Sequence, residues 1–374
     1  MNDTPGRDIL TSLWWAGVNA VRGEAAVRNA LERHQISRPD AIIAIGKAAA
    51  SMAQAALARY GTDTPALIVT KYGHGDDLSD YPHLIEAAHP VPDENALIAG
   101  ETMLRKVRDM EPGSHLLMLV SGGASALAEL PEPGYSLHSL QAENQQMLAK
   151  GLDIHAMNAH RKTLSQIKGG KLLAEFRGTL VTTLAISDVE GDDLSVIGSG
   201  IGDAPEDARF SFDPHIVASN RIARGACAHN AETQFGLRVQ LNDEALYDDI
   251  RALAPMIFDR LQRGPSGLYI WGGEPTVVLP PDPGQGGRNQ ALALLLSREL
   301  SGRHDIDVLV AGTDGTDGPT KAAGGFADGQ VWTDAAEPFL RGADSGHYLE
   351  TRDALFTTGP TGTNVMDLVI ACKY

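Results

Sequence analysis

The sequence predicts an α/β protein whose first domain is a doubly wound parallel sheet, and three observations carry this prediction. From Ala41 onward, apolar runs of about four to eight residues alternate with longer helical patterns. Such runs are typical of parallel strands that helices cover on both faces. Polar or glycine-rich segments follow the runs, where open α/β sheets bind ligands. At about 150 residues per domain, the 374 residues indicate two domains.

The elements of the first domain follow from local signals. Apolar residues at helical spacing, Leu10, Leu13, Trp14, Val18 and Val21, predict an amphipathic N-terminal helix. Apolar runs predict strands over 41–45, 66–70, 84–88, 115–120, 179–186 and 215–218. Helical patterns cover 47–59, 93–108 and 159–176, and another helix begins near 220.

A charged, amphipathic pattern over 243–263 predicts a helix, which the sequence Arg-Gly-Pro ends. We place the domain junction near this helix, which gives domains 1–240 and 241–374. The second domain is predicted to be a smaller α/β unit with strands at 268–271 and 308–311 and a helix over 291–300. Its many glycines indicate tight loops where the backbone closely approaches a ligand.

Composition excludes several classes of function. The 31 Lys and Arg against 48 Asp and Glu give a net charge of −17, which argues against a partner that is nucleic acid or an anionic membrane. No run of about 18 apolar residues and no secretory signal occurs in the sequence. The two cysteines, Cys227 and Cys372, have neither a disulfide framework nor zinc-ligand spacing, which fits a reducing, cytoplasmic location.

Two loops of the first domain are candidates for binding an anion. Lys47 follows the first strand in a context that is neither a P-loop nor a dinucleotide fingerprint. A cation at a helix N-terminus is unfavourable, so an anionic ligand would compensate it. The small-residue turn Ser121-Gly122-Gly123-Ala124-Ser125 is either an ordinary tight turn or a nest of N–H groups for an anion.

A third loop of the first domain carries four carboxylates within six positions: Asp188, Glu190, Asp192 and Asp193. They form either a solvated acidic loop or a site for a general base or magnesium. A basic stretch over 158–171 is expected on one helix, as a solvated face, and His89 is expected in a structural turn.

The second domain has three further candidate segments. Glu274 follows a predicted strand, and Arg288-Asn289 opens a helix after a glycine-rich loop, where an arginine suits bidentate recognition of carboxylate or phosphate. Asp314 and Asp317 lie in GTDGTDG and are either turn-forming residues or ligands.

The ordered set of motifs resembles the glycerate kinases of the MOFRL type, some of which are called hydroxypyruvate reductases. The motifs are AIGKAA, HPVPDENA, LVSGGASAL, NAHRKTLSQIKGGKL, ISDVEGDD, GQGGRNQALAL, AGTDGTDGPT and TGPTGTNVMDL. The resemblance implies a Rossmann-like N-terminal domain, a C-terminal MOFRL domain and an active site in the cleft between them. It also implies ATP and Mg²⁺, with D-glycerate as the acceptor and 2-phosphoglycerate as the product.

The resemblance also suggests roles for individual residues. It matches Lys47, Asp188 and Arg288 to catalytic positions. We expect the turn formed by Ser121, Gly122, Gly123 and Ser125 to bind the phosphates of ATP. Four residues, Glu274, Asn289, Asp314 and Asp317, are candidates for the substrate or the cleft, and Asp192 is a candidate magnesium ligand. Ile201 stands where relatives often have proline, which predicts a looser loop.

Besides phosphorylation of the 2-hydroxyl, three alternative functions stay open at this point. An NAD(P)H-dependent hydroxypyruvate reductase is disfavoured because GxGxxG is absent and Thr70, Lys71 and Tyr72 stand where its acidic residue would be. A non-catalytic sensor of sugar acids is the second, and a kinase that phosphorylates the 3-hydroxyl of D-glycerate is the third. A homodimer is the candidate assembly.

Overall fold

The computed structural model describes residues 5–75, 78, 81, 83–149 and 154–374. The chain divides into two compact units. The first unit is Arg22–Ser219, and the second unit combines Met1–Val21 with Asn220–Tyr374. The predicted boundary at 240 therefore differs from this division, and so does the placement of the N-terminal helix in the first domain.

The first unit is built on a six-stranded parallel sheet with the order β3-β2-β1-β4-β5-β6. The strands are β1 (Ala41–Ile45), β2 (Ala66–Lys71), β3 (Leu84–Ala87), β4 (His115–Val120), β5 (Leu180–Ile186) and β6 (Ser211–Ala218). Chain order reverses between β1 and β4, as in a doubly wound fold. The predicted fold class is confirmed.

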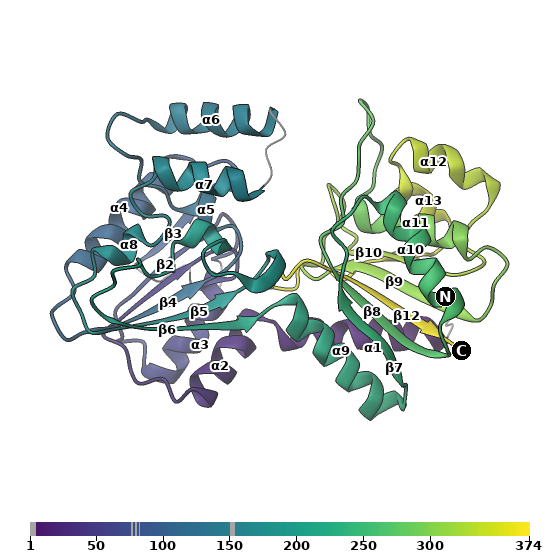
Figure 1. Cartoon of the computed structure of the whole chain (residues 1–374), viewed down its shortest axis with the longest axis horizontal. Coiled ribbons are helices and arrows are strands. Elements are labelled where there is room, and N and C mark those ends of the chain that lie inside the picture. Colours follow the sequence, from purple (N-terminus) through teal and green to yellow (C-terminus); the bar gives the residue numbers. More distant parts are fainter. Residues whose placement is uncertain (1–4, 76–77, 79–80, 82, 150–153) are drawn as a thin grey trace. The chain divides into compact units, whose positions relative to one another are not determined.

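Helices cover both faces of this sheet, as Figure 1 shows. One face carries α2 (Gly23–Arg33) and α3 (Ala49–Tyr60), and the other carries α4 (Glu94–Arg108), α5 (Ala124–Leu127), α6 (Leu137–Ala149), α7 (Ile154–Leu164) and α8 (Lys171–Ala174). The predicted start of α4 is confirmed, because the Asp93 side chain accepts a hydrogen bond from the N–H of Ala96 at 3.1 Å. Two short 3₁₀ helices, Glu190–Asp192 and Ile197–Gly200, follow β5.

The single long helix expected over 159–176 is wrong. The chain leaves α7 at Leu164 and enters α8 only at Lys171. Gly169 and Gly170 between them have φ angles of 63° and 80°, which a continuing right-handed helix does not allow. The basic stretch is therefore not a solvated helix face, because Lys168 is fully buried in this connection.

The second unit contains a mixed six-stranded sheet with the order β11-β10-β9-β12-β8-β7. Its strands are β7 (Val239–Glu244), β8 (Gly267–Gly273), β9 (Ile306–Gly312), β10 (Gly324–Ala327), β11 (Leu355–Phe356) and β12 (Asp367–Lys373). Both β8 and β9 run antiparallel to β12, so the end of each lies beside the start of β12.

Two helices from distant parts of the sequence pack against this second sheet. They are α1 (Pro5–Ala20) and α9 (Asn220–Phe235), which contact each other and the central strands. Trp14 of α1 is fully buried and meets Phe356 edge-to-face, with ring centroids 5.0 Å apart. The apolar face of α1 thus completes the core of the second unit, and this long-range pairing explains why the compact units differ from the division predicted from the sequence.

The helix expected over 243–263 begins later than predicted. Residues Val239–Glu244 form β7, and α10 covers Ile250–Arg263. The Asp249 carboxylate accepts from the N–H of Arg251 at 2.8 Å and so caps the helix at its true start. The remaining helices of the unit are α11 (Arg288–Glu299), α12 (Glu337–Arg341) and α13 (Ser345–Thr351), with a short 3₁₀ helix at Asp334–Ala336.

No helix in the described ranges is long and apolar enough to cross a membrane. Cys227 and Cys372 are free thiols, and burial raises the pKa of each to about 12. Neither thiol is poised for chemistry.

Candidate active site

In the first unit, Lys47 and the Ser121–Ser125 turn meet at the point where strand order reverses. The turn follows β4 and Lys47 follows β1, and these two strands are neighbours. The N–H of Lys47 donates to the carbonyl oxygen of Gly122 at 2.9 Å, which ties the two loops together. Ligands of doubly wound sheets bind at this switch point.

The Ser121 hydroxyl belongs to the scaffold of this turn. Its side chain is 1% exposed, and its Oγ accepts a hydrogen bond from the N–H of Ala48 at 3.1 Å. In contrast, the N–H groups of Gly122, Gly123 and Ala124 donate to no other residue in the part of the chain that the structure describes. The turn therefore offers backbone donors for an anion, while Ser121 holds their position.

Lys47 and Asp188 lie against the two glycines of the turn. A Cβ on Gly122 would collide with the Asp188 carboxylate, and a Cβ on Gly123 would lie 3.3 Å from Cε of Lys47. Glycine at both positions thus lets a cation and a carboxylate converge on one turn. The structure brings these predicted site residues together.

Asp192 lies in the 3₁₀ helix Glu190–Asp192, with a φ of 56°. Across the described residues, no group of three His, Cys, Asp or Glu side chains is placed to hold a metal ion. Asp192 therefore belongs to no preformed metal cluster.

His89 also lies close to Gly123, as Lys47 does. A Cβ on Gly123 would lie 3.2 Å from Nε2 of His89, so the imidazole faces the same turn as Lys47. Burial, followed by the charge of Lys47, lowers the pKa of His89 to about 4. The ring is neutral at neutral pH, and the turn that contains His89 lies beside the Ser121–Ser125 turn.

This pKa predicts a pH dependence of stability. The folded state resists protonation of His89 while the unfolded chain accepts it near pH 6.5, so the contribution of this group to stability is lost as the pH falls from about 6.5 to 4. Between pH 7 and pH 4.5 we expect the wild type to lose about 2 kcal/mol more stability than His89→Gln, allowing for partial solvation. Urea unfolding of both proteins at the two pH values measures this difference. Equal losses would show that His89 carries no burial penalty.

The loop that contains Ile201 is held by packing and by backbone hydrogen bonds, and the looser loop stays a prediction. Ile201 is fully buried in the core of the first unit. The N–H groups of Gly169 and Gly170 donate to the carbonyl oxygens of Ser199 and Gly200, at 2.9 and 3.0 Å.

In the second unit, Arg288 is held by two carboxylates. Its Nε donates to Asp367 at 2.6 Å and its Nη1 to Glu274 at 2.8 Å. Burial opposes the charge of the guanidinium, but Asp367 and then Glu274 outweigh it and raise the pKa of Arg288 above its usual range. Asn289 donates from Nδ2 to the other oxygen of Asp367 at 2.9 Å. Arg288, Glu274 and Asn289 are thus brought together, around a residue that the sequence did not single out.

Asp317 caps the helix that begins at Arg288. Its carboxylate accepts from the N–H groups of Asn289 and Gln290 at 3.1 and 2.8 Å, and from the Gln290 side chain at 3.0 Å. Burial raises the pKa of Asp317 to about 6, although the N–H donors oppose this shift. Asp314 accepts from the N–H of Thr316 at 2.8 Å, as a turn-forming residue does. Within the second unit, Asp317 thus positions the start of α11.

This capping role predicts a loss of stability. Asp317→Ala removes the acceptor of three hydrogen bonds at a buried helix start and is expected to lower the free energy of unfolding by about 2 kcal/mol. Asp314→Ala is the matched control from the same loop, with an expected loss of about 0.5 kcal/mol. Urea unfolding measures both, and equal losses would contradict the capping role.

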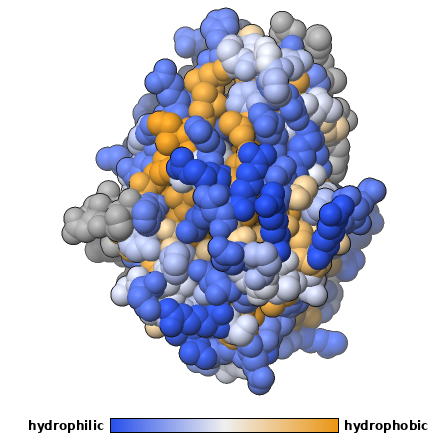
Figure 2. All heavy atoms as spheres, turned by 90° about the vertical axis from the view of Figure 1, so that its left-hand side faces the viewer, coloured by the Kyte–Doolittle hydropathy of each residue, from blue (hydrophilic) through white to orange (hydrophobic). Residues whose placement is uncertain are grey.

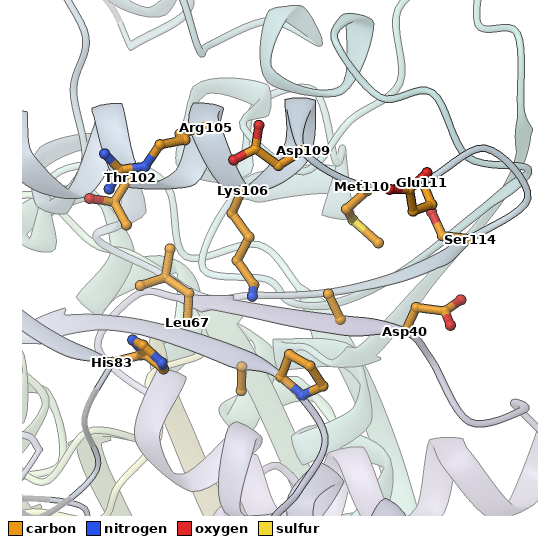
Figure 3. Close-up of a pocket in the computed structure, with 13 residues that line it drawn as sticks. Asp40, Leu67, His83, Thr102, Arg105, Lys106, Asp109, Met110, Glu111 and Ser114 are labelled. Carbon is orange, nitrogen blue, oxygen red and sulfur yellow. The ribbon is translucent and has the colours of Figure 1, made fainter.

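A larger pocket of the first unit lies at the opposite edge of the sheet. It has a volume of about 520 Å³, and residues before the strands and along α4 line it, among them Asp40, Arg105, Lys106, Asp109 and Glu111 (Figure 3). Figure 2 shows this side of the molecule, which is mostly hydrophilic with some clustered hydrophobic side chains. Three carboxylates outnumber two cations in the pocket, and it lies at the amino ends of the strands. Both features disfavour it as the site for an anionic substrate.

Several polar residues of these sites were missed or misjudged from the sequence. Asp367 is 2% exposed and joins Arg288 to Asn289, yet in the sequence it is one acidic residue before an apolar strand. Glu129 and Lys168 form a buried ion pair across 39 residues of sequence. Lys168 lies within one of the motifs and Glu129 lies in none, and sequence spacing does not show which charges are buried together.

Comparisons with known proteins agree with this architecture. Residues 9–214 match a domain of unknown function, DUF4147, and residues 267–367 match the MOFRL family. The chain is 35% identical to a D-glycerate 2-kinase of Thermotoga maritima, over 94% of this chain and 95% of the relative. It is also 35% identical to a putative hydroxypyruvate reductase of Agrobacterium vitis, over 87% of this chain and 97% of the relative. A crystal structure of a glycerate kinase from Thermotoga maritima superimposes with a TM-score of 0.90 at 31% identity and covers 98% of this chain and 99% of that chain.

Proposed function

The chain belongs to the glycerate kinase family that combines the DUF4147 and MOFRL domains, and from this premise we propose that it phosphorylates D-glycerate with ATP. The product is 2-phosphoglycerate. The observation that carries the proposal is the convergence of Lys47, Asp188 and the backbone donors of Gly122 and Gly123 at the switch point of the first sheet.

Phosphoryl transfer requires in-line positioning and the neutralisation of developing charge rather than covalent chemistry from the protein. The ammonium group of Lys47 stabilises the negative charge on the transferring phosphoryl group. The N–H groups from Gly122 to Ser125 bind the phosphates of ATP. Asp188 orients the 2-hydroxyl of D-glycerate and accepts its proton as the new O–P bond forms, while the bond between the γ-phosphorus and the β-phosphate oxygen of ATP breaks and ADP leaves.

The guanidinium of Arg288 presents its N–H donors in a fixed direction. Asp367 and Glu274 offset its positive charge and fix the plane of the guanidinium, while Nη2 makes no hydrogen bond within the described part of the chain. We assign this nitrogen to an oxygen of a bound phosphate. Asn289 and Asp317 support the geometry around Arg288, and Glu274 acts as its acceptor.

The first unit has enough carboxylates near the phosphate-binding turn to hold Mg²⁺. It is usually held by one or two carboxylates together with substrate phosphates, so it needs no three-residue cluster. Asp192 is the carboxylate that would hold it, and the ion would offset charge on the phosphates of ATP. Mg²⁺ is thus proposed as part of the nucleotide complex. The cytoplasmic location and the homodimer stay predictions.

A reductase function has less support. The relative from Agrobacterium vitis carries that name. However, the β1 loop presents Lys47 where a dinucleotide-binding protein of this topology presents its glycine fingerprint, and β2 ends at Thr70-Lys71 without the acidic residue that binds a ribose.

The test is an assay with D-glycerate, ATP and Mg²⁺, in which phosphorus NMR resolves the position of the phosphate. A 2-phosphate product supports the proposal, and a 3-phosphate would keep the kinase but change the acceptor hydroxyl. Oxidation of NADH by hydroxypyruvate, with no phosphorylated product, would favour the reductase.

A further inference from the structure

Tyr72 directly follows β2 and presents its ring to solvent in a fixed orientation. Its side chain is 49% exposed, although its hydroxyl makes two hydrogen bonds. The hydroxyl donates to Oδ2 of Asp93 at 2.8 Å and accepts from Nδ2 of Asn95 at 2.9 Å. The bond to Asp93 also raises the pKa of Tyr72, so the phenol stays protonated at neutral pH. Because the polar end of the side chain is engaged, the surface left open is mainly the apolar ring.

The two partners of Tyr72 are themselves held in place. The other oxygen of Asp93 accepts from the N–H of Ala96 and caps α4. Nδ2 of Asn95 also donates to the carbonyl oxygen of Glu86, in β3, at 2.8 Å. A helix start and a strand therefore fix the ring, which has little conformational freedom left to lose when a ligand binds.

The next residues of this loop are tied to β3 and to the loop after β1. The N–H groups of Gly73 and Gly75 donate to the Glu86 carboxylate at 2.9 and 3.1 Å. The His74 ring donates from Nδ1 to the carbonyl oxygen of Lys47 at 3.2 Å. The loop is thus fixed against the residue proposed to stabilise the transferring phosphoryl group.

The end of β2 is the place where doubly wound folds contact the nucleoside part of a nucleotide. In dinucleotide-binding proteins the first βα turn holds the pyrophosphate, and an acidic residue after the second strand binds the ribose. Here Lys47 follows the first strand and Tyr72 follows the second. Since β1 separates β2 from β4, the Tyr72 loop and the Ser121–Ser125 turn begin about 10 Å apart at one edge of the sheet. An extended nucleoside triphosphate spans this separation.

We propose that the base of ATP stacks on the ring of Tyr72, which makes Tyr72 a nucleotide-positioning residue. The proposal rests on the proposed function for the identity of the nucleotide. Bases stack on exposed aromatic rings of proteins, and a ring that is already fixed holds the base in one place. With the base on Tyr72, the phosphates extend along the edge of the sheet toward Lys47 and the Ser121–Ser125 turn.

Stacking on Tyr72 predicts a preference among nucleotides. The ring recognises the face of a base and not its edges, and a purine covers more of it than a pyrimidine does. We therefore expect the wild type to bind ATP more tightly than CTP, and this difference to shrink in Tyr72→Ala. A preference that is the same in the variant would contradict stacking on Tyr72.

The test compares ATP with inorganic tripolyphosphate, which has the phosphates but no base. In calorimetry with Mg²⁺, Tyr72→Ala should weaken the binding of ATP about 20-fold and leave the binding of tripolyphosphate unchanged. KM for ATP should rise similarly, while kcat and KM for D-glycerate stay near the wild-type values. Tyr72→Phe keeps the ring and should retain most of the affinity. The matched control is Tyr135→Ala, which removes a 43% exposed tyrosine on another loop of the same unit and should match the wild type.

The outcomes separate the two proposals. Equal weakening of ATP and tripolyphosphate, or unchanged affinity for ATP, overturns the stacking of the base on Tyr72 while the kinase stands. Weaker binding of ATP alone in Tyr72→Ala, without phosphorylation of D-glycerate by the wild type, keeps the stacking and refutes the kinase. A wild type that binds no ATP refutes both. Urea unfolding identifies a variant that fails to fold; for Tyr72→Ala, the comparison of Tyr72→Phe with Tyr72→Leu, which keeps apolar bulk without the aromatic ring, then decides.

Discussion

Replacing Lys47 with alanine is expected to lower kcat with saturating ATP and D-glycerate about 10³-fold, which corresponds to about 4 kcal/mol of transition-state stabilisation. The reason is that the charge on the transferring phosphoryl group develops next to a turn that otherwise offers only backbone dipoles. The terminal methylene of Lys47 already lies against that turn, at Gly123. Steady-state kinetics with both substrates varied measures the effect.

Lys106→Ala is the matched control for this substitution. It removes a lysine from the same unit, but from the pocket at the amino ends of the strands (Figure 3). We expect it to leave kcat within about twofold of the wild type. Lys47→Arg should recover part of the rate because it restores the positive charge. Near-normal turnover of Lys47→Ala would contradict the role that we assign to Lys47.

Asp188→Asn is expected to lower kcat about 10²- to 10³-fold and to change KM for D-glycerate much less. The amide has nearly the shape of the carboxylate, so it preserves contact with Gly122 and can still orient a hydroxyl. It cannot accept the proton that the hydroxyl loses. Measurement of kcat and both KM values, at several Mg²⁺ concentrations, separates this loss from weaker binding.

Glu190→Gln is the control for Asp188, since Glu190 is an exposed carboxylate of the same acidic loop. It should behave as the wild type. If excess Mg²⁺ restored the activity of Asp188→Asn, the residue would be a metal ligand rather than a base. Unchanged turnover and unchanged Mg²⁺ dependence would remove Asp188 from the site.

The local pattern of the sequence determined most of the first sheet. The apolar runs at 41–45, 66–70 and 115–120 correspond to β1, β2 and β4, because a strand buried on both faces must be apolar along its whole length. The same reasoning located the loops that follow the strands, and hence Lys47, the Ser121–Ser125 turn and Asp188. Placement after a parallel strand was sufficient to group these residues, since the ends of neighbouring parallel strands share one edge.

The tertiary structure decided what depends on contacts between distant parts of the sequence. Trp14 packs against Phe356, so the N-terminal helix belongs to the second unit, although in sequence it directly precedes the first. The same holds for Asp317, which caps the helix of Arg288 from 29 residues away, and for Asp367, which holds that arginine in place.

The buried charges of the first unit show the same division. The sequence alone determined that basic residues gather over 158–171, and it identified the motif that contains them. Only the fold buried Lys168 against Glu129 and placed Arg161 in a cavity beside His89. The physical reason is that the energy of a charge depends on the solvent and the partners around it, and these come from segments that are close in space but far apart in sequence.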